Sequence, residues 1–164
     1  MTFKTEQEKF WAGEFGENYI SRNQGPELLA SNLAFFSKAL AKANGLQSVI
    51  EFGANIGMNI KALKILFPKQ EQFAIEINAK AADELETIIP SSHVFRDSIL
   101  EFSNDKKFDL ALIKGVLIHI NPDELPKVYE KLYNAASRYL LVCEYYNPSP
   151  VKIDYRGQTD RLFK

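Results

Sequence analysis

The chain has 164 residues, a formal net charge of −1 and nearly equal numbers of acidic and basic side chains. This length suits one domain with a single core and is too short for two comfortable ones. The balanced charge argues against nucleic acid as a partner, and no segment is long enough to span a bilayer. Cys143 is the single cysteine, which excludes an intrachain disulfide and most cysteine-based metal sites.

Residues 1–45 are predicted to form a helical cap at the N-terminus. They open on charged residues without the apolar core of a signal peptide, so we expect a soluble, cytoplasmic chain. Thr5 and Glu8 have the spacing of a capping box that begins a first helix. A second amphipathic segment carries Tyr19 and Arg22, and Pro26 suits the first turn of a third, longer helix.

Residues 46–144 alternate between strand and helix patterns and are predicted to form an α/β core. The expected strands are residues 48–52, 72–77, 93–96, 109–113 and 139–144. The expected helices are residues 58–67, 79–89 and 123–137, the last with Asp123 as its N-cap. Nearly continuous apolar runs at residues 110–113 and 140–143 are typical of parallel strands covered on both faces. The prediction is a single α/β domain with an open, mostly parallel, Rossmann-like sheet.

Residues 49–59 join the first strand to a helix through a turn that contains Gly53 and Gly57. Small residues let a ligand approach the backbone, and the N–H groups that open the helix face that ligand. Asn55 stands where the dinucleotide fingerprint G-x-G-x-x-G needs its second glycine. A nucleotide-binding α/β domain and an ordinary structural turn are the two alternatives to the interpretation given below.

Polar residues follow the later strands at positions where open parallel sheets bind ligands. Glu76 ends the second strand, where a carboxylate can accept hydrogen bonds from both hydroxyls of a ribose. Asp97 follows the third strand, and Lys114 follows the fourth. Each such residue alone is more often a solvated loop residue, so the argument rests on their common register.

The order of these motifs resembles that of the class I S-adenosylmethionine-dependent methyltransferases. The chain looks closest to the methylases associated with pseudaminic acid biosynthesis. The residues that carry this resemblance are 5–16, 51–57, 76–77, 97–99, 115–122 and 144–148. The resemblance implies a class I methyltransferase fold, S-adenosylmethionine as cofactor, S-adenosylhomocysteine as product and no metal. It also implies a small-molecule acceptor such as a nonulosonic acid or another sugar-pathway intermediate, with a non-catalytic cofactor-binding domain as the alternative.

The resemblance assigns the methionine half of the cofactor to the turn after the first strand. Gly53 and Asn55 would line it, with Glu51 holding the loop and Gly57 opening the helix. The backbone carbonyl of Lys114 would receive the ammonium group of the cofactor. The side chain of Lys114 would either reach an acidic substrate or lie in solvent.

The adenosine half is assigned to the ends of the second and third strands. Glu76 would bind the ribose, and Ile77 and Ile99 would sandwich the adenine ring. Asp97 and Ser98 would contact the edge of that ring.

The remaining candidates face the methionine carboxylate or the acceptor. Tyr19 and Arg22 would close over the carboxylate, although a core-edge tyrosine and a surface arginine explain them equally well. His119 is the candidate general base because a histidine changes its charge near neutral pH. A packing role for His119 is the alternative. Further acceptor-side candidates are Tyr145, Tyr146 and Asn147, with Tyr146 as a second catalytic candidate.

Residues 145–164 are predicted to form a tail with Pro148 and Pro150 near its start. This tail is too short to supply the helix and two strands that usually follow the fifth strand in the resembling family. We therefore expect a truncated form of that fold, with its C-terminal strands missing and the fifth strand at the edge of the sheet. An exposed apolar edge favours pairing with another chain, so self-association through the fifth strand is a further expectation.

Overall fold

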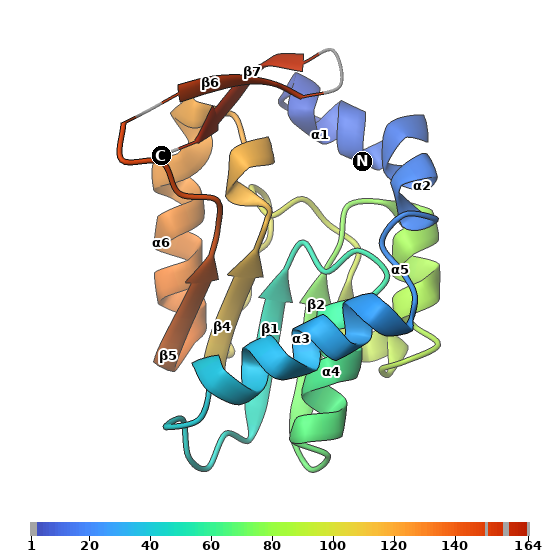
Figure 1. Cartoon of the computed structure of the whole chain (residues 1–164), viewed down its shortest axis with the longest axis vertical. Coiled ribbons are helices and arrows are strands. Elements are labelled where there is room, and N and C mark those ends of the chain that lie inside the picture. The colour runs from blue at the N-terminus through green and yellow to red at the C-terminus, as the bar shows by residue number, and fades with distance from the viewer. Residues whose placement is uncertain (1–2, 150, 156–157, 164) are drawn as a thin grey trace.

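The computed structural model describes residues 3–149, 151–155 and 158–163, with side chains as far as Ser149 and at Val151. Five parallel strands form an open sheet in the order β3-β2-β1-β4-β5 (Figure 1). These strands are β1 (Ser48–Phe52), β2 (Glu71–Ile75), β3 (Val94–Phe95), β4 (Phe108–Lys114) and β5 (Ala136–Cys143). The order reverses between β1 and β4, and ligands bind at such a switch point. The predicted parallel α/β sheet is confirmed.

Helices cover the two faces of the sheet unequally. One face carries α3 (Pro26–Ala39), α4 (Met58–Leu66) and α5 (Ala79–Leu85), and the other carries α6 (Leu125–Ala135). The division follows the alternation of side chains along each strand, because neighbouring residues of a strand point to opposite faces. On β4, Leu110 and Leu112 pack with α3 and α4, whereas Ala111 and Ile113 pack with α6.

The apolar run 110–113 is buried as predicted. The run 140–143 is not covered on both faces, because it lies on the edge strand β5, where Leu140 and Val142 are 44% and 47% exposed.

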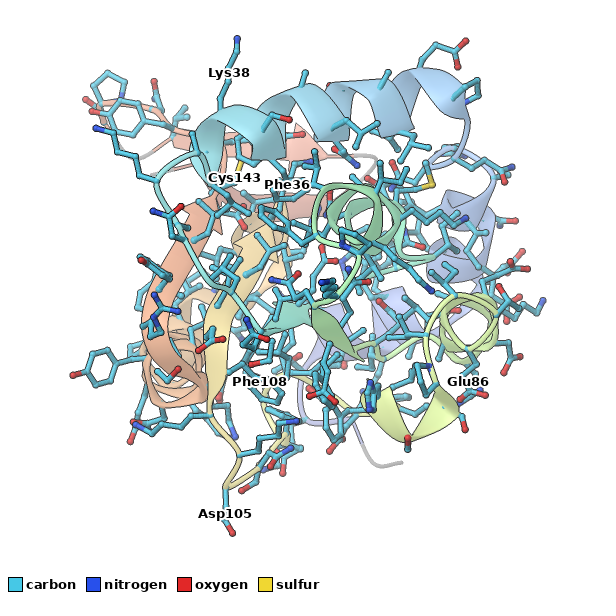
Figure 2. All side chains as sticks on the ribbon, turned by 90° about the horizontal axis from the view of Figure 1, so that it is seen from below. Phe36, Lys38, Glu86, Asp105, Phe108 and Cys143 are labelled. Carbon is cyan, nitrogen blue, oxygen red and sulfur yellow. The ribbon has the colours of Figure 1, made fainter. Side chains whose placement is uncertain are left out.

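Phe36 is fully buried between α3 and the sheet, and Figure 2 shows it pointing inward while Lys38 points away from the molecule. Phe108 at the start of β4 is likewise fully buried. Burying one such side chain contributes about 1.5–3 kcal/mol of hydrophobic stabilisation.

Two short helices, α1 (Glu6–Ala12) and α2 (Glu14–Ile20), precede α3. The predicted capping box is present: the Thr5 side chain accepts from the Glu8 backbone N–H at 3.1 Å, and the Glu8 carboxylate accepts from the Thr5 N–H at 2.8 Å. Both helices are too short to be stable alone, so their contacts with the rest of the chain must hold them in place.

The predicted N-cap of the last helix is wrong. Asn121 caps a 3-10 turn, η3 (Pro122–Glu124), through its side chain, which accepts from the Asp123 backbone N–H at 3.1 Å. The α-helix then begins at Leu125, so that Pro126 lies in its first turn, where its missing N–H costs no hydrogen bond.

The tail forms two strands, β6 (Val151–Tyr155) and β7 (Gln158–Phe163), which pair as an antiparallel hairpin. Such a hairpin needs only a tight turn, so the short tail suffices for strands although not for a further α/β unit. The hairpin stays separate from the main sheet, and β5 is the last strand of that sheet. Figure 1 shows the hairpin beyond the carboxyl ends of the strands, and β7 lies beside η2 (Leu117–His119).

Candidate functional site

A cavity of about 370 Å³ lies at the carboxyl end of the sheet, a volume within the range of small-molecule sites. The loops after β1, β2, β3 and β4 line it on the side of the sheet, and α1, α2 and α3 line it on the side of the N-terminal cap. The predicted site residues that line this cavity are Tyr19, Gly53, Asn55, Glu76, Ile77, Asp97, Ser98, Ile99, Lys114 and His119. The common edge of the parallel strands therefore brings most of the predicted site together.

The turn after β1 is built on an alternation of left-handed residues. Gly53, Asn55 and Gly57 have φ values of 76°, 49° and 75°. Within the described residues Asn55 is the one non-glycine with a positive φ, and asparagine tolerates this conformation better than most residues. A Cβ at Gly53 would lie only 2.9 Å from Cγ2 of Val116. Asn55 thus adopts a left-handed backbone conformation, which a glycine at this position would adopt without strain.

Glu76 is a buried carboxylate that lines the cavity. Its Oε2 accepts from the Asn55 backbone N–H at 2.7 Å, and its Oε1 accepts from the Asn78 backbone N–H at 2.8 Å. Burial raises the pKa of Glu76, while these backbone hydrogen bonds favour its charged form. A carboxylate has about four acceptor positions, so capacity remains for a ligand hydroxyl beside these two bonds and the Ile77 backbone N–H.

Glu51 and Gly57 support the turn from outside the cavity lining. Glu51 is 1% exposed and accepts a hydrogen bond of 2.5 Å from Nδ2 of Asn59, which ties β1 to the first turn of α4. Burial raises the pKa of Glu51 to about 8, although the Asn59 hydrogen bond and the charge of Lys114 oppose that shift. A Cβ at Gly57 would lie 2.7 Å from Leu85, so this glycine permits close packing of α4 with α5.

The loop after β3 is joined to the N-terminal cap. The Ser98 hydroxyl donates to the Glu8 carboxylate and accepts from the Leu100 backbone N–H at 3.1 Å. Asp97 accepts from the Ser98 backbone N–H at 2.8 Å, and both residues line the cavity with Ile99. The hydroxyl proton of Ser98 is therefore held by Glu8, its backbone N–H by Asp97 and its carbonyl by the N–H groups of Glu101 and Phe102. The second lone pair of the hydroxyl is left for the predicted contact with adenine.

An aromatic wall closes the side of the cavity formed by the cap. Trp11 lies 4.5 Å from the ring of His119 and 5.1 Å from the ring of Tyr19, and all three line the cavity. Nε1 of Trp11 is buried and has no hydrogen-bond partner among the described residues. The sequence analysis predicts no role for Trp11. Two features of the sequence could have indicated one: it is the only tryptophan, and it lies on a short helix that needs a packing partner.

Asn78 and Gly16 fix this wall against α5. The Asn78 side chain caps α5 by accepting from the Ala81 N–H at 3.1 Å, and its Nδ2 donates to the Trp11 carbonyl at 3.1 Å. A Cβ on Gly16 would lie 1.9 Å from that same carbonyl oxygen, so only glycine allows the two short helices to approach so closely.

The loop after β4 carries the remaining predicted residues. Oε1 of Glu144 accepts from the backbone N–H groups of Val116 and Leu117 at 2.8 and 3.0 Å, and its burial raises its pKa. These bonds hold η2, which places the buried His119 ring at the cavity. Lys114 lies half-buried at the end of β4 and also lines the cavity.

Five of the predicted residues lie outside the cavity lining: Glu51 and Gly57, which support the turn after β1, and also Arg22, Tyr146 and Asn147. Arg22 is exposed, and Tyr146 is 80% exposed. Tyr145 lines the cavity instead of its neighbour, because adjacent residues leaving a strand point in opposite directions. The predicted roles of Arg22 and Tyr146 therefore find no geometric support in this conformation.

Comparisons with known proteins place the fold. No family model and no curated protein sequence matches the chain. Among solved structures, the plantazolicin methyltransferase BpumL in complex with SAH superposes with a TM-score of 0.66 at 18% identity, over 85% of this chain and 57% of that protein. The sugar N-methyltransferase KedS8 from Streptoalloteichus sp ATCC 53650 gives 0.66 at 13% identity, over 89% and 62%. The fold is that of the class I methyltransferases.

A third structure of the same fold is a SAM-dependent methyltransferase from Archaeoglobus fulgidus. It superposes with a TM-score of 0.65 at 17% identity, over 83% of this chain and 61% of that one. The chain thus spans 57–62% of the length of these three structures. In the described part of the chain, no helix has the length and apolar character needed to cross a bilayer.

Proposed function

We propose that this chain is an S-adenosylmethionine-dependent methyltransferase that acts on a small molecule. The observation that carries the proposal is Glu76, a buried carboxylate at the end of β2 that lines the cavity with acceptor positions to spare. It lies in a fold whose compared members are methyltransferases. A ribose offers two neighbouring hydroxyl donors of the kind that this carboxylate can accept.

The residues of the cavity fit such a cofactor. Ile77 and Ile99 supply apolar surface near Glu76 for the adenine ring, and Asp97 supplies an acceptor beside it. Gly53 lines the cavity without a side chain of its own, so the methionine half can lie against the backbone of this turn, next to the Val116 side chain. When bound, S-adenosylmethionine supplies a methyl group on a positively charged sulfur, which is a good leaving group.

The chain's own contribution to methyl transfer is alignment and proton removal. Holding two reactants in an aligned geometry can supply about 7–11 kcal/mol of a barrier of this kind. His119 is buried at the cavity beside Trp11, and we assign it the removal of a proton from the acceptor. Tyr145 lines the same part of the cavity and would contact the acceptor.

For the acceptor we propose a sugar-pathway intermediate, such as a nonulosonic acid. The support is the sequence resemblance to methylases associated with pseudaminic acid biosynthesis and the likeness to KedS8, which is described as a sugar N-methyltransferase. Polar and aromatic side chains also share the cavity lining, as in sites that recognise small polar ligands.

Ligand-dependent stability tests the cofactor directly. S-adenosylhomocysteine at about 100 times its dissociation constant should stabilise the fold by about 2.7 kcal/mol. Glu76→Ala should remove most of this effect, whereas Glu84→Ala, an exposed carboxylate on α5, should leave it intact. NAD serves as the competing ligand. Stabilisation by NAD alone, or by neither ligand, would refute the proposal, and binding without methyl transfer would leave a cofactor-binding domain.

A further inference from the structure

Lys114 is the cationic side chain of the cavity. It follows directly on the apolar run of β4, is half-buried, and is the one lysine or arginine among the described residues that line the cavity. Its ammonium makes no ion pair with the described part of the chain. Placing a charge in a partly buried site without a partner is costly, so a lysine in this position calls for an anion.

Two amide side chains, those of Asn32 and Asn59, line the same cavity as Lys114. Asn32 of α3 is 3% exposed and lines the cavity. Oδ1 of Asn59 is buried without a partner among the described residues, although its Nδ2 donates to Glu51. Leu110 and Leu112 of β4 pack on α3 and α4, so alternation along the strand turns Lys114 toward the same helices.

The charges of two carboxyl groups, those of Glu51 and Glu144, interact with the charge of Lys114. Burial raises the pKa of Glu51 to about 8, so this group is mostly protonated at pH 7. The Oε1 atom of Glu144 is held by the backbone N–H groups of Val116 and Leu117. The cavity therefore has its cationic side chain at the end of β4, whereas the acidic side chains of Glu76 and Asp97 line it at the ends of β2 and β3.

We propose that Lys114, together with Asn32, forms an anion subsite, and that the methyl acceptor carries a carboxylate or a phosphate that binds there. This proposal rests on the proposed function, and it names the acceptor class. Adenosine is assigned to the ends of β2 and β3, so the end of β4 lies on the far side of the switch point from it. The backbone N–H groups that open α4 at Met58 and Asn59 suit the cofactor's own carboxylate, which leaves Lys114 for the acceptor.

The test compares matched acidic and neutral sugars on protein saturated with S-adenosylhomocysteine. The probes are glucuronate, glucose 6-phosphate and glucose, and the readout is the fluorescence of Trp11, the only tryptophan, which lines the cavity. We expect at least one acid to bind about 10- to 100-fold more tightly than glucose, as for a hydrogen bond to a charged group. Which acid is preferred distinguishes a carboxylate from a phosphate.

Lys114→Met should abolish the preference for the acid, and Lys114→Gln provides a second neutral variant. Lys114→Arg should keep the preference, as should Lys38→Met, which removes the same charge from an exposed position on α3. S-adenosylhomocysteine affinity should stay within about threefold in every variant, a shift well under one factor of ten.

Equal binding of all three sugars to the wild type overturns the proposal. So does a larger loss of S-adenosylhomocysteine affinity on Lys114→Met, which would assign Lys114 to the cofactor. If the wild type does not bind S-adenosylhomocysteine at all, it is the proposed function that fails.

Discussion

Glu51 is a buried acid whose ionisation opposes folding. Its pKa rises from 4.5 to about 8 in the folded chain, chiefly through burial. Between these values the folded state retains a proton that the unfolded state has released. The free energy of unfolding therefore falls as pH rises through this window, by up to about 1.4 kcal/mol per pH unit. Stability from the protonated group is fully present below pH 4.5 and is lost as pH rises toward 8.

Glu51→Gln should remove this pH dependence while keeping the shape of the side chain. The variant should gain stability relative to the wild type as pH rises from 5 to 8, because it cannot ionise. Urea unfolding of both proteins at several pH values in that window measures the difference. Glu76 and Glu144 also have raised pKa values, but their contributions cancel in the comparison. A difference that does not change with pH would contradict the assigned pKa.

The catalytic assignment of His119 can be separated from its packing against Trp11. His119→Asn should reduce turnover by about 10²–10⁴-fold, the usual effect of losing a general base. Affinity for S-adenosylhomocysteine should remain nearly unchanged, because no predicted cofactor contact involves the imidazole. Single-turnover kinetics and Trp11 fluorescence give the two readouts on the same sample. Full turnover in a folded variant would assign His119 to packing alone.

At the scale of elements, the turn after β1 depends on residues that tolerate a positive φ. Asn55→Val should destabilise the fold by about 1–3 kcal/mol, since a β-branched residue is strained in this conformation. Asn55→Gly is the matched control and should be close to neutral, because glycine adopts the same φ freely. Denaturant unfolding of the two variants measures the difference. Equal stability of both would show that the turn adopts another backbone conformation in solution.

The sequence predicted the elements whose signals are local. Apolar runs such as 110–113 located the strands, and the spacing of Gly53 and Gly57 located the turn that lines the cavity. The N-cap of α6 was misassigned because a 3-10 turn and an α-helix share the same opening residues, and here Asn121 caps the former. The hairpin of the tail was not predicted, because the short length of the tail and the prolines near its start argued against a helix and two further strands.

The part of the site that could not be predicted comes from contacts between distant residues. Glu8 was recognised as half of a capping box, but its bond to Ser98 joins positions 90 residues apart. Asn32 has no local signal, because one asparagine on an amphipathic helix is commonplace and only the packing of α3 on the sheet brings it to the cavity. Trp11 faces the cavity for the same reason, through the bond from Asn78 to its carbonyl.

At the scale of the whole molecule, the N-terminal cap and the sheet form one unit around the cavity. Glu8 reaches the loop after β3, and Asn78 reaches the end of α1. Lys80 and Glu17 add an ion pair of 2.6 Å between α5 and α2, although both side chains are partly exposed and the pair contributes little. A ligand that fills the cavity touches both parts, so its binding should slow hydrogen exchange in α1 and α2 as well as in the sheet.

The free edge of β5 leads to a prediction about association between copies of the chain. In the described structure β5 has a partner only on the side of β4, and Leu140 and Val142 on it are 44% and 47% exposed. Unpaired backbone groups beside exposed apolar side chains favour pairing with a second strand, here the β5 of another copy. The chain should therefore sediment increasingly as a dimer when its concentration is raised.

Val142→Lys should shift it toward monomer, because a charge on an edge strand opposes pairing. Ile65→Lys, at a 58% exposed position on α4, should leave the association unchanged. Sedimentation velocity over a concentration series measures all three proteins, and a wild type that stays monomeric throughout would rule out this interface.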